Sequence, residues 1–268
     1  MTPGAWSWSA EALIPLALAA WYLAATRNRR ETARTISFLA GCALLVAVLV
    51  TPLDTLARTY LVWAHLLQNV VLAEWAPLLL VVGIPPALAA RLSRPRVVKA
   101  LTQPFVALPL WVATYAIWHI PALYDAALGR PGSLLALEHA SYVAAGVVFW
   151  WCVWQTEPHR LSSGARAGYV VAAFVLSAPL GLVLALVPRA VYGFYADAPE
   201  RVFGLSRLTD QQLGGMTMAA EQSVVFFAVF AYYLLRFLRD EEAAGARLTT
   251  STAQERRRAA DGFARPRR

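Results

Sequence analysis

Long apolar runs alternate along this chain with short polar connections. Each run approaches or exceeds the roughly 20 residues that a helix needs to cross a bilayer. The pattern therefore predicts an all-α, polytopic membrane protein with seven transmembrane helices within residues 1–239. The seven predicted crossings are residues 9–26, 35–53, 59–83, 104–120, 134–155, 167–188 and 211–238.

Composition agrees with the pattern. The chain is 59% hydrophobic and 15% charged, with a mean hydropathy of +0.50, which is far from the balance of a soluble domain. Residues 240–268 differ from the rest because they are charged and poor in apolar side chains. We expect this segment to form a disordered cytoplasmic tail.

The positive charges predict the orientation. Of the 24 Lys and Arg residues, 19 lie in the first, third and fifth connections and in the tail from Arg236 onward, and 5 lie in the alternate connections. Because cytoplasmic loops carry the excess of positive charge, the N-terminus is expected outside and the C-terminus inside. The net charge of +8 thus reflects topology, and no nucleic-acid partner is expected.

Three of the four histidines then fall at the extracytoplasmic ends of predicted helices. His65 lies early in the third crossing, His119 ends the fourth and His139 begins the fifth. Histidine can bind a metal or carry a proton, and an ionisable residue in a membrane helix is a functional candidate. The alternative for each ring is a structural hydrogen bond at the membrane boundary.

Polar side chains on two predicted helices lie near the same membrane boundary as these histidines. On the third crossing, Gln68 and Asn69 share a face with His65 and either join a site or bond helices together. Glu74 lies on the opposite side of that helix, where it would pair with a polar group elsewhere or stay protonated.

On the seventh crossing, Asp210 begins a polar face that continues to Glu221. An aspartate there serves equally well as a helix cap or as a metal ligand. Gly214 and Gly215 would allow close helix approach. Met216 offers a thioether for soft Cu(I), although methionine in an apolar helix more often only packs.

The residue types leave the chemistry open. Imidazole with carboxylate or thioether accepts copper, zinc or iron. The two cysteines, Cys42 and Cys152, lie in apolar segments and do not form a CxxC motif, so neither a disulfide framework nor a thiolate site is predicted. No nucleotide-binding loop or hydrolase motif occurs in a suitable context, and an enzymatic role is not expected.

Several motifs taken in order resemble one known family. They are AHLLQN (64–69), WHIPALYDAAL (118–128), LEH (137–139), LSAPLGLVLAL (176–186) and DQQLGGMTM (210–218). Over about residues 55–238, the chain resembles the CtaG family of cytochrome c oxidase assembly factors. The resemblance implies a multi-pass protein of the bacterial plasma membrane that helps mature a haem-copper oxidase subunit, receives copper from copper chaperones and delivers it to the catalytic subunit.

Carried onto this sequence, the resemblance implies a metal site formed by His65, His119 and His139. Asp125 and Asp210 match the acidic positions of the family, and Met216 is a further expected partner. Asn69 is a departure, because many members have a second histidine there. Glu221 also stands where an apolar residue is expected.

Two other functions fit the same sequence. The protein could transport copper or another small solute across the bilayer, with Glu74 and Glu221 as polar positions along the path. Alternatively, it could be a metal-free chaperone that binds the oxidase subunit through its apolar surface, with the histidines serving only as hydrogen-bonding groups.

Overall fold

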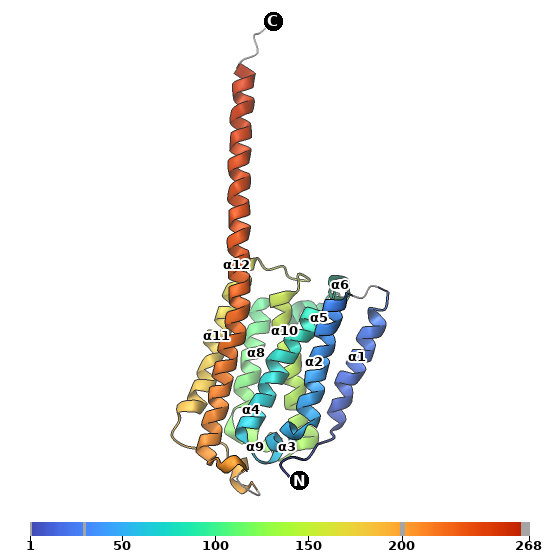
Figure 1. The fold of residues 1–268 in the computed structure, drawn as a ribbon, viewed down its shortest axis with the longest axis vertical. Coiled ribbons are helices and arrows are strands. Elements are labelled where there is room, and N and C mark those ends of the chain that lie inside the picture. The colour runs from blue at the N-terminus through green and yellow to red at the C-terminus, as the bar shows by residue number, and fades with distance from the viewer. Residues whose placement is uncertain (1, 29–30, 199–201, 264–268) are drawn as a thin grey trace.

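The computed structural model describes residues 2–28, 31–198 and 202–263, with side-chain environments described as far as Arg247. All secondary structure in these ranges is helical (Figure 1). The main helices are α1 Leu13–Ala25, α2 Thr32–Val50, α3 Pro52–Thr59, α4 Val62–Val70, α5 Ala76–Gly83, α6 Pro86–Leu92, α7 Arg96–Leu101, α8 Pro104–Trp118, α9 Pro121–Leu128, α10 Ala136–Trp154, α11 Ser163–Leu186 and α12 Arg207–Phe263. Short 3-10 turns occupy Ala10–Ala12, Phe194–Asp197 and Val202–Gly204, and wide π turns occupy Val71–Trp75 and Pro131–Leu135.

Five of these helical segments are long and apolar enough to cross a membrane. They are Thr32–Val50, Val62–Gly83, Pro131–Trp154, Ser163–Leu186 and Arg207–Arg247. A sixth span results if α8 and α9, which meet at an angle of 75°, are counted as one. The first predicted crossing is the shorter apolar helix Ala10–Ala25. The membrane character and the all-helical fold are therefore confirmed, with five or six candidate spans in the described residues.

Prolines determine where several helices begin. Pro52, Pro86, Pro104 and Pro121 each occupy the first turn of a helix, where a missing amide hydrogen costs nothing. Pro121 also explains why α8 ends, because a residue before proline avoids the helical region. Ile120 accordingly has ψ of 120°, and His119 lies at the resulting corner.

Aromatic packing and close backbone contacts hold the bundle together. Trp111 of α8 stacks on Phe149 of α10 with ring centroids 4.6 Å apart. The predicted close approach at Gly215 is confirmed, since an added Cβ would lie 2.6 Å from the carbonyl oxygen of Gly181 on α11. Gly146 of α10 is tighter still, because a Cβ there would lie 2.2 Å from the carbonyl oxygen of Ala73. This contact brings α10 against the π turn of the third span.

The C-terminal segment extends α12, and its expected disorder and cytoplasmic location stay predictions. Helix α12 continues without a break to Phe263 and leaves the bundle as a single rod (Figure 1). Residues 240–263 contain six Ala, four Arg and three Glu residues, and these residue types favour helix even without tertiary contacts. The rest of the predicted tail, 264–268, lies outside the described residues.

Candidate functional site

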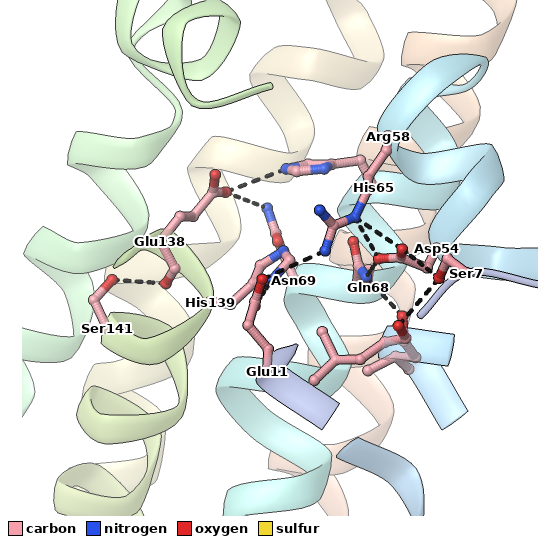
Figure 2. Close-up of polar contacts among 12 residues, drawn as sticks. Ser7, Glu11, Asp54, Arg58, His65, Gln68, Asn69, Glu138, His139 and Ser141 are labelled. Atoms are coloured by element: carbon pink, nitrogen blue, oxygen red, sulfur yellow. Dashed lines mark hydrogen bonds and ion pairs between the residues drawn. The ribbon is translucent and has the colours of Figure 1, made fainter. Parts of the chain in front are cut away.

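Three side chains from α4 and α10 meet at a buried carboxylate. His65 Nε2 lies 3.2 Å from Glu138 Oε1, and Asn69 Nδ2 donates to the same oxygen at 3.0 Å (Figure 2). All three residues have 0% exposed surface. Residues 65 and 69 are one helical turn apart on α4, so both side chains reach the same acceptor. Glu138 thus holds His65 in one orientation.

His119 is held by its own helix. Its Nδ1 lies 2.8 Å from the carbonyl oxygen of Tyr115, one turn back on α8. The hydroxyl of Tyr142 on α10 lies 3.4 Å from the same nitrogen. A ring nitrogen that bonds to a carbonyl must carry the hydrogen, so Nε2 of the neutral ring keeps a free lone pair.

The two rings share this property. His65 bonds to the acceptor Glu138 through Nε2, so the neutral ring has its lone pair on Nδ1. Neither His65 Nδ1 nor His119 Nε2 has a hydrogen-bond partner in the described part of the chain, and Glu138 Oε2 has none either. Both rings lie beside Tyr124, with centroids 4.9 Å and 6.4 Å from its ring.

This arrangement suits a metal in one respect and falls short in another. Metal-binding histidines commonly donate their second ring N–H to a carboxylate or carbonyl group, and both rings do so here. However, the described residues contain no group of three or more His, Cys, Asp and Glu side chains already placed around one metal position. The side chains would have to converge further to complete a coordination sphere.

His139 belongs to a neighbouring network. Its Nδ1 lies 2.8 Å from Glu11 Oε2, and Glu11 Oε1 lies 3.5 Å from Arg58 Nη2 (Figure 2). Arg58 also pairs with Asp54 at 2.8 Å. Asp54 in turn accepts hydrogen bonds from Ser7 at 2.7 Å and from Gln68 at 2.9 Å. The third expected histidine therefore contacts the N-terminal segment, whereas His65 contacts Glu138.

The expected acidic partners hold backbone amides. Asp125 accepts from the amides of Gly193 and Phe194, each at 3.0 Å, and so fixes the loop before α12. Asp210 accepts from the amides of Val62 and Trp63, each at 2.9 Å. Asp210 therefore caps the N-terminus of α4, whereas the sequence suggested a cap only at the N-terminus of its own helix.

Met216, the remaining expected partner, is 59% exposed on α12. Its side chain lies on the outer surface of the bundle, because Gly215 and Met218 occupy the packed face of the helix. Met216 is thus exposed, whereas the three histidines are buried.

The sequence did not predict that tyrosines of the loop before α12 pack beside the site. Tyr192, in the loop between α11 and α12, stacks on Tyr124 with centroids 3.8 Å apart. Tyr195, in the same loop, donates to the carbonyl oxygen of Ala57. Burial raises the pKa of both loop phenols above the usual range, so both stay neutral. The only sequence signal was that two tyrosines lie in the connection before the last predicted crossing.

Comparison with known proteins identifies the family. The sequence profile of the cytochrome c oxidase caa3 assembly factor family matches residues 17–240. The chain belongs to this family. The match covers every residue of the two polar networks described above except Ser7 and Glu11.

Relatives of this family member add little about its activity. It is 26% identical over 231 residues to uncharacterized proteins of Mycobacterium bovis and Mycobacterium tuberculosis. The aligned part is 77% of this chain and 34% of each relative, so the chain spans about a third of their length. No solved structure matches it.

Proposed function

We propose that this member of the caa3 oxidase assembly family binds copper as cargo at the outer end of the bundle and assists its delivery to the catalytic subunit of a haem-copper oxidase. His65 and His119 supply the nitrogen ligands, and Glu138 orients His65 and offers an oxygen. The observation that carries the proposal is that each ring is fixed through one nitrogen and keeps the other unpaired, a state that His139, held by Glu11, shares.

The proposal includes a topology. Seven crossings in a bacterial plasma membrane, with the N-terminus outside, place His65, His119 and the Tyr192 loop on the extracytoplasmic side. The distribution of Lys and Arg supports this orientation. Helix α1, with its preceding turn, would provide the first crossing.

The other expected ligands have supporting roles in this proposal. His139 lies next to Glu138 in the chain and connects the site to the N-terminal segment through Glu11. Asp125 and Asp210 hold the loop and α4 in place. Met216 contributes no ligand to the buried site.

Copper titration of the detergent-purified protein tests the proposal. His65→Asn and His119→Asn should each weaken copper binding about tenfold or more, because each removes a ligand nitrogen. His159→Asn is the matched control, since this ring lies on an exposed loop and bonds to the carbonyl oxygen of Lys99. Equal copper binding by the wild type and both site variants would overturn the proposal.

The same variants in cells connect binding with function. Oxidase activity and oxidase copper content should fall with His65→Asn and His119→Asn while the assembly factor itself still accumulates. Lost copper binding with unchanged oxidase activity would separate the metal site from assembly.

A metal-free chaperone is the second candidate, and one observation favours it: the described residues hold no ready group of three ligands. That function predicts no copper binding by the purified protein and normal oxidase assembly in both histidine variants. A transporter instead predicts copper uptake into sealed vesicles that contain the protein alone.

A further inference from the structure

A second buried polar cluster lies deeper in the bundle, between the third span and α12. Glu74, in the π turn Val71–Trp75, accepts hydrogen bonds at Oε1 from Tyr115 at 2.8 Å and from Gln222 at 2.9 Å. Glu221 of α12 accepts at Oε1 from the indole of Trp75. Because Trp75 follows Glu74 and Gln222 follows Glu221 in the chain, these hydrogen bonds bring the two carboxyl groups next to each other.

The second oxygen of each carboxyl group has no donor. Glu74 Oε2 and Glu221 Oε2 are both buried without a hydrogen-bond partner in the described part of the chain. Glu74 has no exposed surface and Glu221 has 9%. No ion pair of the described residues includes either side chain. Two ionised carboxylates in contact would repel each other strongly where no cation offsets their charge.

The surrounding donors cannot turn to these oxygens. Gln222 uses its amide oxygen to accept from Ser177 at 3.3 Å, which leaves its NH₂ group directed at Glu74. Tyr115 has a single hydroxyl hydrogen, and Glu74 Oε1 accepts it. The other titratable group that faces Glu74 is Glu221 itself.

From these contacts we infer that Glu74 and Glu221 form a proton-binding site within the membrane layer, in which one proton is shared between the two unpartnered oxygens. One carboxyl group is then a neutral acid that donates to the other, as in buried carboxyl pairs elsewhere. The π turn supports the assignment, since such wide turns recur at functional positions in helices. The inference does not depend on copper binding by the outer site.

Infrared spectroscopy of the full-length, detergent-purified protein tests this site. A protonated carboxyl group gives a C=O stretch that an ionised one lacks. We expect the wild type to show this band at neutral pH, to keep it as the pH is raised through the range in which exposed carboxyls titrate, and to shift it when glutamate is labelled with ¹³C. A wild type without a ¹³C-sensitive band would overturn the inference, and this measurement needs no variant.

Single amide variants show whether one proton is shared. Both Glu74→Gln and Glu221→Gln should lose the band, because the new amide donates to the remaining carboxylate and removes its need for a proton. Retention of the band in either variant would mean that burial alone protonates the other group, which overturns the sharing. Glu138→Gln is the control and should keep the band, because Glu138 lies outside this pair.

Discussion

Glu138 and Glu74 are both fully buried on helices that pack against each other, but their neighbours differ. Glu138 faces the imidazole of His65 and the amide of Asn69, whereas Glu74 faces the carboxyl group of Glu221. A carboxylate with an imidazole partner can remain ionised, but a carboxyl group beside a second one must keep a proton or be repelled. A buried glutamate therefore leaves free ligand atoms in the outer cluster, which consists of His65, Asn69, His119 and Glu138. In the inner cluster, which consists of Glu74, Tyr115, Glu221 and Gln222, a buried glutamate holds a proton.

Tyr115 lies between the two clusters. Its hydroxyl donates to Glu74, and its carbonyl oxygen accepts from His119. The contacts use opposite ends of one residue on α8, so any movement of the tyrosine changes both clusters. The comparison predicts that variants of the two clusters will differ in metal binding and in protonation, and that variants near Tyr115 will affect both.

The largest expected effect comes from removing the carboxylate of the outer cluster. Glu138→Ala leaves the donors of His65 and Asn69 buried and unpaired, which should lower the stability of the folded protein by about 3 kcal/mol. Thermal unfolding in detergent measures the loss. Glu138→Gln keeps an acceptor oxygen and should lose less than half as much, so equal losses for Ala and Gln would contradict this account.

Removing the carboxyl group of the inner cluster should cost less. Glu74→Ala leaves the donors of Tyr115 and Gln222 unpaired but also relieves the crowding of two carboxyl groups, so we expect a loss of about 2 kcal/mol. Glu74→Gln should be close to neutral, because its amide pairs with Glu221. Unfolding of both variants beside the Glu138 pair tests whether the two clusters differ as proposed. A Glu74→Gln variant as unstable as Glu138→Ala would count against the shared proton.

The sequence predicted the helical fold well because its signals are local. Apolar runs near the length of a bilayer crossing placed most of the long helices within a few residues. The break after Trp118 could also be read from Pro121. The count of crossings was less certain, because the first run forms a helix of only 13 residues, Leu13–Ala25.

The site could be predicted only in part, because its partners come from distant segments. His65 and His119 were singled out from their positions at helix ends, and both lie beside Tyr124. Glu138 was not predicted to bond His65, since 73 residues separate them and no periodicity relates the two helices. The contact of His139 with Glu11 was missed for the same reason, and the family resemblance suggested that His139 joined the other two histidines.

Adding a histidine at position 69, where the family resemblance leads us to expect one, would sharpen the contrast between the clusters. Asn69→His adds an imidazole next to Glu138, and copper binding should tighten by about tenfold, which corresponds to about 1.4 kcal/mol. Copper titration measures the change, and the carboxyl infrared band of the inner cluster should not move. Asn69→Gln is the matched control, because it keeps an amide and adds no ligand nitrogen. Unchanged affinity in Asn69→His would place the copper away from this face of α4.

The smallest effect is expected at Asp210, which holds the first turn of α4. Asp210→Asn keeps one acceptor for the amides of Val62 and Trp63 but loses the charge that favours a helix N-terminus, so stability should fall by about 1 kcal/mol. Copper affinity should stay within error of the wild type, because the carboxylate bonds to backbone amides of α4. Met216→Leu should change neither quantity. A loss of copper binding with Asp210→Asn, at unchanged thermal stability, would make this aspartate a ligand and would extend the outer cluster to α12.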